Sequence, residues 1–253
     1  MIVTRPQLTV RLARDADDIL AAARLRYAVF VEELGGTGAG VDHAARVERD
    51  RFDAVAEHLL LVDEARPAGD QVVGLYRLLS QEGAAQIGQF YSEDEFDLRP
   101  LHRSGRRLLE LGRSCLHPDY RGGGAMFRLW QGLAEHVERR GVELLFGTAS
   151  FPGTRIADVA GSLSLLHRAH LAPEELRVIS RDQPAPDLLP EERVDRAAAM
   201  RAMPALIKAY LRLGGQVGQG VFIDHDFNCM DVCMLLDLSR VDARQTALYR
   251  TPQ

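Results

Sequence analysis

The chain has 253 residues, of which 46% are hydrophobic and 26% are charged, a composition that is ordinary for a globular protein. A formal net charge of -5 lacks the basic excess of a protein that binds nucleic acid over its whole surface, so we expect no nucleic-acid partner. Cys115, Cys229 and Cys233 form no CxxC pair, and we expect neither a disulfide framework nor a metal. This cysteine usage favours a reducing cytoplasm, and since no apolar run approaches the ~20 residues of a membrane span, we expect the chain not to cross a membrane.

The first predicted elements are one helix and two strands. Apolar residues at helical spacing predict a helix that is capped by Asp15 or Asp17, runs through Phe30 and ends before the glycines that follow. Two apolar runs, His58–Val62 and Val72–Leu79, flank a turn with proline and glycine. We therefore predict that they pair as an antiparallel hairpin.

The middle of the chain predicts a strand, a glycine-rich turn, a helix and a second strand. Leu108–Leu116 is the first strand, and the glycine-rich turn 118–124 follows it. The helix keeps its apolar residues on one stripe and stops at Gly141, after which Val142–Ala149 resumes as an apolar strand. Such a βαβ unit places its first loop at the carboxyl end of a strand, where ligands usually bind.

The end of the chain predicts an extension of this core. Three prolines within residues 184–190 indicate an extended connector. Pro204 suits the first turn of a helix that runs to Gly214, and Val221–Ile223 and Asp231–Leu238 predict two added strands. We expect one domain over residues 1–253, in which residues 184–253 pack on the core.

The glycine-rich turn carries a candidate anion site. Glycines before a helix let backbone N–H groups approach a phosphate, and the helix dipole adds favourable potential. The segment from Glu110 to Gly122, with the overlapping run Arg121-Gly122-Gly123-Gly124-Ala125, resembles the pyrophosphate loop of the GNAT superfamily, Arg/Gln-x-x-Gly-x-Gly/Ala. Met126 departs from that motif at its last position. A phosphopantetheine carried by an acyl carrier protein brings a single phosphate, which a looser loop can hold.

The resemblance extends along the chain to two families. Blocks around Arg26–Glu33, Asp50–Asp53, Tyr76–Leu79 and Glu110–Arg113 resemble acyl-homoserine lactone synthases. The chain is more similar still to ornithine lipid N-acyltransferases. The blocks that carry this second likeness are Arg51-Phe52-Asp53, His58-Leu59-Leu60, Val73–Leu79, Phe90–Glu93, Glu95-Phe96-Asp97, Leu109–Cys115, Ala149–Thr154 and Ala209–Gly215.

This resemblance implies a fold, a reaction and a partner. The fold is α/β (α+β), a GNAT-like mixed twisted sheet flanked by helices, with a C-terminal helical extension and two added strands. The reaction joins a 3-hydroxyacyl group from acyl carrier protein to the α-amine of ornithine and gives lyso-ornithine lipid. No cofactor is needed beyond the acyl-phosphopantetheine of the carrier, and peripheral contact with the inner face of the membrane is expected.

Acylation of an amine requires a base and support for the oxyanion. Glu110 interrupts an apolar strand, so this carboxylate is either the base or the partner of Arg113 or Arg77 in an ion pair. Gly112 permits a bulge that frees a main-chain N–H near Cys115 or Leu116 as the oxyanion donor. With the resemblance, we assign Glu110, Arg113 and Asp50 to catalysis, and Leu116 with the Arg121–Ala125 loop to the donor.

The acceptor requires a cation for its carboxylate and an acid for its side-chain ammonium. Arg77 or Arg113 meets the first need. Asp50 or Asp53 meets the second, although both acids also suit the capping of a helix or turn. In the blocks that carry the resemblance, Arg26 and Phe30 are assigned to the substrate together with Asp53 and Arg77.

Four further side chains have ordinary structural interpretations. His58 is an alternative base that ranks below Glu110, because one histidine beside an apolar strand is usually structural. Cys115 has no activating base at a diagnostic spacing, so we predict core packing for it rather than a covalent acyl-enzyme. Trp130 and Phe127, on the helix after the loop, are predicted to be core residues.

Other functions stay open. The acceptor could be glycine, lysine or glutamine, and a homoserine lactone synthase would use S-adenosylmethionine. A GNAT module that binds a ligand without turnover is favoured by Met126. Four arginines ahead of the active strand predict a docking face for an acidic carrier protein; they are Arg99, Arg103, Arg106 and Arg107.

Overall fold

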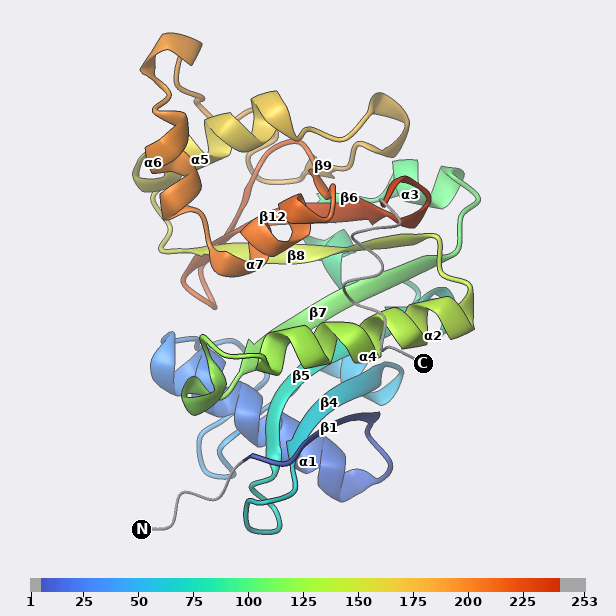
Figure 1. Ribbon diagram of the computed structural model, residues 1–253. Coiled ribbons are helices and arrows are strands. Elements are labelled where there is room, and N and C mark those ends of the chain that lie inside the picture. The colour runs from blue at the N-terminus through green and yellow to red at the C-terminus, as the bar shows by residue number, and fades with distance from the viewer. Residues whose placement is uncertain (1–5, 242–253) are drawn as a thin grey trace. The chain divides into compact units, whose positions relative to one another are not determined.

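The computed structural model describes residues 6–241 and divides them into two compact units. The first unit holds residues 6–88 and 111–141, and the second holds residues 89–110 and 142–241. The chain passes from the second unit back into the first within strand β7 (Leu108–Leu116), which Figure 1 shows in green. Our expectation of one domain over 1–253, with 184–253 as an extension, stays a prediction; residues 1–5 and 242–253 lie outside the described part.

The first unit is built on four neighbouring strands in the order β1-β4-β5-β7. β1 (Leu8–Leu12) pairs antiparallel with β4 (Glu57–Asp63), and β4 pairs antiparallel with β5 (Val72–Ser80). These bounds confirm the predicted hairpin. A separate small ladder joins β2 (Val41–Asp42) to β3 (Val47–Glu48).

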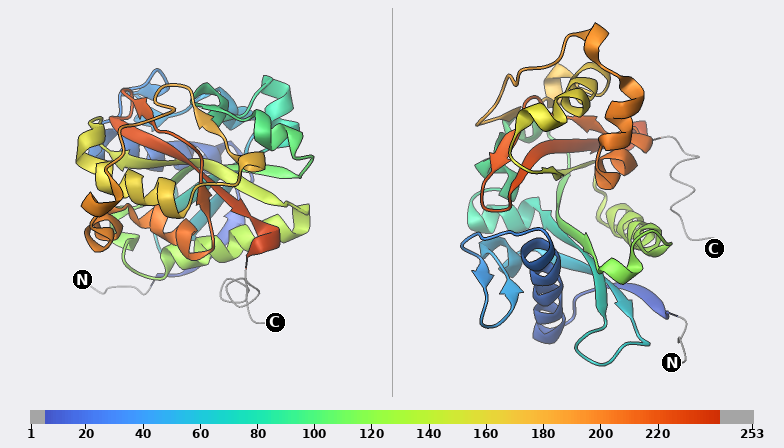
Figure 2. Two further views of the ribbon diagram at one scale, coloured as in Figure 1. Left: turned by 90° about the horizontal axis from the view of Figure 1, so that it is seen from above. Right: turned by 90° about the vertical axis from the view of Figure 1, so that its left-hand side faces the viewer.

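Two helices cover the two faces of this sheet (Figure 2). Helix α1 (Ala16–Arg26) contributes Ala22 and Leu25 to a core that also contains Leu60 and Leu75 of the strands. Helix α4 (Ala125–Arg140) lies on the other face, where Gly132 leaves room for Val10 of β1. Since side chains alternate along a strand, the apolar runs of β4 and β5 supply both faces. The short helix α2 (Gln81–Ile87) follows β5.

The helix predicted to run through Phe30 changes type after Arg26. Asp15 caps α1 by accepting a hydrogen bond from the backbone N–H of Asp18, as predicted. A π-helical segment, Tyr27–Glu33, then continues it, and the Leu34 N–H donates to the Val29 carbonyl, five residues back. Apolar periodicity predicted a continued α-helix over this segment, and the structure has a π-helix there instead. The wider π-helical turn is rare and often marks a functional site.

The second unit contains the parallel pair that the βαβ pattern predicts. Leu108–Glu110 of β7 pairs in parallel with Leu144–Phe146 of β8 (Leu144–Pro152). β12 (Cys229–Asp237) pairs antiparallel with β8 along its whole length. β10 (Gln216–Val217) and β11 (Phe222–Asp224) pair with β12, and β6 (Phe96–Asp97) pairs with β9 (Ile179–Ser180). The predicted strands at the chain's end are therefore β11 and β12.

The helices of the second unit are α3 (Arg99–Arg103), α5 (Ile156–Ala169), α6 (Arg196–Ala202) and α7 (Ala205–Arg212). Pro204 directly precedes α7, as the sequence predicted. Short 3-10 turns occupy Arg51–Ala54, Tyr91–Asp94, Pro118–Tyr120, Glu174–Leu176, Glu191–Arg193 and Leu238–Arg240 across the two units. Among the described residues no helix is both long enough and apolar enough to span a bilayer. A mixed sheet with flanking helices confirms the predicted fold class.

Candidate active site

A 3-10 turn, Arg51–Ala54, brings two carboxylates together in the first unit. Asp50 caps the turn by accepting from the Phe52 N–H at 2.9 Å, and Asp53 Oδ2 accepts from the Asp50 N–H at 2.9 Å. This reciprocal capping box fixes both side chains. The capping interpretation is therefore confirmed, and each carboxylate has oxygen atoms left for other partners.

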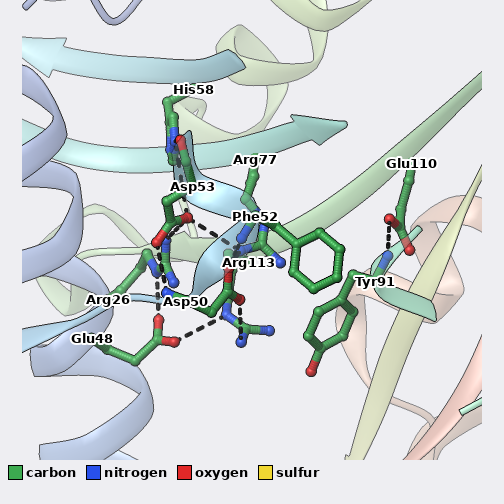
Figure 3. A network of polar contacts seen from close by, with 10 residues as sticks. All are labelled: Arg26, Glu48, Asp50, Phe52, Asp53, His58, Arg77, Tyr91, Glu110 and Arg113. Carbon is green, nitrogen blue, oxygen red and sulfur yellow. Dashed lines mark hydrogen bonds and ion pairs between the residues drawn. The ribbon is translucent and has the colours of Figure 1, made fainter. Parts of the chain in front are cut away.

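Two buried arginines contact these carboxylates (Figure 3). Arg26, at the end of α1 and 1% exposed, contacts Asp53 Oδ1 through Nη1 at 2.5 Å and forms a short ion pair with Glu48. Arg77 Nη1 lies 2.5 Å from Asp50 Oδ1 and 3.1 Å from Asp53 Oδ1. Charges buried this deeply require partners, and these arginines and acids supply them to one another.

Arg113 completes this acid–arginine network, which comprises Arg26, Glu48, Asp50, Asp53, Arg77 and Arg113. Its Nε lies 3.3 Å from Glu48 Oε1, and its Nη2 lies 3.1 Å from Asp50 Oδ2. The backbone of Arg113 is left-handed, with φ of +50°, inside strand β7. The strand is thus irregular one residue after Gly112, where we predicted a bulge. A non-glycine residue held in this region is strained, and such strain concentrates at functional sites.

The network holds its two aspartates ionised. Burial alone would raise the pKa of Asp53, but the charges of Arg26 and Arg77 outweigh it and lower that pKa to about 2. Burial would also raise the pKa of Asp50, but the charges of Arg77 and Arg113 outweigh it and lower that pKa. Three acids and three arginines balance formally, and Asp50 is the more exposed of the two aspartates, at 19% against 10%. The Asp50–Arg113 edge is therefore the more accessible part of the network.

His58 lies beside the network and is neutral near pH 7. Its Nε2 is 3.3 Å from the Asp53 carbonyl oxygen, and its ring is 2% exposed. Burial lowers the pKa of His58 even though Asp53 opposes this. Among residues 6–241 no hydrogen-bond partner meets its Nδ1. A neutral imidazole with an open nitrogen has the chemistry of a base, but its burial favours a structural role.

Glu110 belongs to the second unit, where it anchors a turn. Its Oε2 accepts from the Tyr91 N–H at 2.8 Å, and its Oε1 accepts from the Ser92 N–H at 2.7 Å and from the Ser92 hydroxyl. The carboxylate is 2% exposed. These bonds explain how an acid is accommodated within an apolar strand. The assignment of Glu110 as the base stays a prediction.

The predicted phosphate loop directly precedes α4, and the space around the backbone of its glycines is free. Gly122 has φ of +76°, and added side-chain atoms at Gly122, Gly123 or Gly124 would meet nothing within 4 Å. Gly124 is the N-cap of α4 and provides no side-chain cap, whereas Ala125 is buried at the first helical position. Uncapped N–H groups at a helix start are suited to an anion.

The Arg121 side chain is directed toward Glu33 and the end of β7 rather than along the loop. Its guanidinium forms a bidentate pair with Glu33, at 2.5 and 2.7 Å, and donates twice to the Leu116 carbonyl at 3.1 Å. Leu116 itself is buried at the end of β7. The loop therefore offers backbone N–H groups, while the charge of its arginine is balanced by Glu33.

Other predicted residues divide between core and surface. Cys115 packs in the core against α1, and burial raises its pKa to about 12, as core packing predicts. Phe30 packs at the edge of the same core. Trp130 is buried and donates to the Tyr76 hydroxyl at 3.1 Å. Phe127 is 43% exposed, so its prediction as a core residue is wrong; it lies off the apolar stripe of α4.

Sequence reasoning missed Glu48 and Glu33. Glu48 is 1% exposed and bridges Arg26 and Arg113. It stands in the charge-rich stretch 46–51, whose lack of apolar periodicity gave no sign of burial. Glu48 could have been found only from the requirement that the three arginines of the network be balanced by three acids.

Comparisons with known proteins define the class first. Residues 25–131 match the model of the acetyltransferase (GNAT) domain. Two solved structures share the fold. FeeM, an N-acyl amino acid synthase from uncultured soil microbes, is 12% identical with a TM-score of 0.54, and 93% of each chain is covered. The AHL synthase LasI is 15% identical with a TM-score of 0.52, and the match covers 98% of this chain and 99% of that chain. The chain thus has the GNAT fold.

Relatives of known name narrow this class. The chain is 54% identical over 242 residues to the L-ornithine N(alpha)-acyltransferase of Rhodobacter capsulatus. The match covers 95% of this chain and 93% of that protein. It is 40% identical over 248 residues to the enzyme of the same name from Brucella abortus, covering 96% of this chain and 88% of that protein. The chain belongs to the L-ornithine N(alpha)-acyltransferase family, as the resemblance of its sequence blocks indicated.

Proposed function

We propose that this protein transfers a 3-hydroxyacyl group from the phosphopantetheine thioester of acyl carrier protein to the α-amine of ornithine, giving lyso-ornithine lipid. The proposal is supported above all by the sequence of this protein, which is 54% identical to an L-ornithine N(alpha)-acyltransferase over nearly the whole length of both chains. The reaction forms a bond between the α-nitrogen and the acyl carbon and breaks the bond between that carbon and sulfur. The proton lost by the amine is taken up by a base, and the pantetheine thiol leaves protonated.

The donor is proposed to dock its phosphate on the loop Gly122–Ala125. Backbone N–H groups there are uncapped, and the charge of Arg121 is already balanced by Glu33. Coenzyme A brings a diphosphate and a further phosphate, which require more positive charge than this loop offers. A carrier-bound phosphopantetheine has one phosphate diester, so the charge balance of the loop favours the carrier. A main-chain N–H near Leu116 is the proposed oxyanion donor.

The acceptor is proposed to meet the accessible edge of the acid–arginine network. Arg113 is 11% exposed and Asp50 is 19% exposed, so this pair offers a cation for the ornithine carboxylate and an anion for its side-chain ammonium. Asp53 is engaged through both oxygens, which favours a role in positioning Arg26 and Arg77. The product is amphipathic and partitions into a membrane. We therefore propose that the protein releases it during peripheral contact with the inner face of the membrane, as the sequence led us to expect.

A comparison of donors tests this proposal. Purified protein is given ornithine with either 3-hydroxyacyl carrier protein or the coenzyme A thioester of the same acyl chain, and free thiol is measured over time. We expect kcat/KM to be at least about tenfold higher with the carrier protein, which corresponds to ~1.4 kcal/mol of donor recognition. Equal or faster turnover with the coenzyme A thioester would contradict the proposed donor.

A further inference from the structure

The pair between Glu33 and Arg121 joins two segments that are far apart in the sequence. Glu33 is the last residue of the π-helical segment, and Arg121 is the first residue of the glycine-rich loop. The two oxygens of Glu33 lie 2.5 and 2.7 Å from Nη1 and Nη2 of Arg121. A planar guanidinium that faces a carboxylate in this bidentate way is held in orientation as well as in charge.

Every nitrogen of the Arg121 guanidinium is used by this arrangement. Nη1 donates to Glu33, Nε donates to the Leu116 carbonyl, and Nη2 donates to both. The hydrogen bond to Glu33 is the main reason why the pKa of Arg121 is raised. Arg121 therefore fastens the start of the loop to the end of β7, and Glu33 fixes the direction of the guanidinium that does so.

The residues before Arg121 are held at a second point. The Tyr120 hydroxyl donates to Asp63 Oδ2 at 2.5 Å, and the His117 N–H donates to the Val73 carbonyl at 2.8 Å. After Arg121, a Cβ atom added to Gly122, Gly123 or Gly124 would have no neighbouring atom within 4 Å. The Glu33–Arg121 pair is thus the last side-chain attachment before Gly122–Gly124 among the contacts described.

The π-helical segment accounts for how Glu33 reaches the loop. In an α-helix of 3.6 residues per turn, residues seven apart lie on nearly the same face. Arg26 is buried at 1% exposure within the acid–arginine network, whereas Glu33, seven residues later, is 36% exposed on the loop side. The wider π turns rotate Glu33 away from the face of Arg26. One continuous helical element thereby positions both an arginine of the network and the carboxylate that orients Arg121.

We propose that Glu33 is a positioning residue for the acyl donor: through Arg121 it holds the loop 121–124 in the conformation in which the N–H groups of Gly122–Ala125 receive the donor's phosphate. This inference rests on the proposed use of that loop by the carrier's phosphopantetheine. It assigns Arg121 the task of shaping the loop. The alternative is that Glu33 competes with the phosphate for Arg121, and the two roles predict opposite changes in the donor's KM.

The test compares Glu33→Gln with a matched control, Glu32→Gln. Each variant removes one carboxylate from the same segment, but Glu32 pairs with Arg46 on the surface at 2.7 Å. Two measurements are made on the purified full-length proteins. Hydrogen–deuterium exchange of peptides covering residues 117–128 reports on the loop in the free protein. Steady-state kinetics give kcat and the KM values for 3-hydroxyacyl carrier protein and for ornithine.

We expect Glu33→Gln to speed exchange in the loop and to raise the KM for the carrier protein by roughly three- to fivefold, the upper part of the range for loss of an exposed, well-oriented ion pair. The KM for ornithine and the kcat should stay within about twofold of the parent values, and Glu32→Gln should change none of them. Unchanged exchange in Glu33→Gln, or an unchanged or lower carrier KM, would overturn the inference. A parent protein that does not turn over this donor and acceptor would refute the proposed function instead, and the exchange comparison would still decide the role of Glu33.

Discussion

Arg113 reaches Asp50, at 3.1 Å between Nη2 and Oδ2, from a backbone that is left-handed within a strand. Left-handed geometry costs a side chain other than glycine roughly 1 kcal/mol or more. Two substitutions of Arg113 distinguish the effect of the strained backbone on stability from the effect of losing the guanidinium. Arg113→Gly and Arg113→Ala both remove the ion pairs, but only glycine adopts φ of +50° without strain.

We therefore expect Arg113→Gly to be more stable than Arg113→Ala by about 1 kcal/mol in urea unfolding, although glycine normally weakens a strand. Turnover should be lost to a similar extent in both, because both lack the guanidinium. If alanine were the more stable replacement, the strand would not be strained at Arg113. Turnover retained by Arg113→Gly would remove the guanidinium from the mechanism.

Asp53 gives the network a dependence on pH. Its pKa of about 2 in the folded protein is depressed from the ordinary 3.8, so its contribution to stability is complete above about pH 4 and is lost as the pH falls toward 2. The shift corresponds to about 2 kcal/mol. The difference in unfolding free energy between the parent protein and Asp53→Asn should therefore shrink by about that amount from pH 5 to pH 2. Asp187→Asn, at an exposed position, is the control. A difference independent of pH would show that Asp53 is not held ionised by Arg26 and Arg77.

The sequence predicted those parts of the fold that follow from apolar periodicity. β7 was predicted with its observed bounds, and the hairpin of β4 and β5 within a residue at each end. Apolar spacing could not distinguish a π-helical segment from a continued α-helix after Arg26, because both keep residues such as Val29 buried. Helix α5 was missed, since its small residues give a weak pattern.

The candidate site was predicted only in part. Asp50, Asp53, Arg77 and Arg113 were identified from the resemblance and from acids beside a strand, and the structure brings them together. Glu48 and Glu33 were not, because their importance arises from partners that are distant in sequence. The pairing of Arg121 with Glu33 likewise follows from tertiary geometry and from no motif.

Cys115 provides a test of direct transfer. It is buried at 5% exposure with a pKa of about 12, so little thiolate is present near pH 7. Cys115→Ala should keep kcat within about twofold of the parent value, whereas removal of a covalent nucleophile costs several orders of magnitude. Intact mass spectrometry of the parent protein with donor alone should reveal no acyl adduct. An adduct that disappears in Cys115→Ala would contradict direct attack by the amine.

Glu110 is the remaining assignment for the base. Its carboxylate accepts hydrogen bonds from Tyr91 and Ser92 through both oxygens, so Glu110→Gln loses one acceptor and should cost about 1–3 kcal/mol of stability. If Glu110 also moves the proton, kcat should fall by about a hundredfold or more at a temperature where the variant is folded. Ser92→Ala, which removes only the hydroxyl contact, is the matched control for the turn. A folded Glu110→Gln protein that lowers kcat no more than Ser92→Ala would leave Glu110 as an anchor alone.

The acceptor and the nitrogen that is acylated can be identified in one experiment. Purified protein with 3-hydroxyacyl carrier protein is offered ornithine or glycine at equal concentration; thiol release gives the rate, and mass spectrometric fragmentation of the product locates the acyl group. We expect faster release with ornithine and a product acylated on the α-nitrogen, because a charge-assisted contact at each end of ornithine fixes which amine meets the thioester. Faster release with glycine, or an acyl group on the side-chain nitrogen, would contradict this expectation.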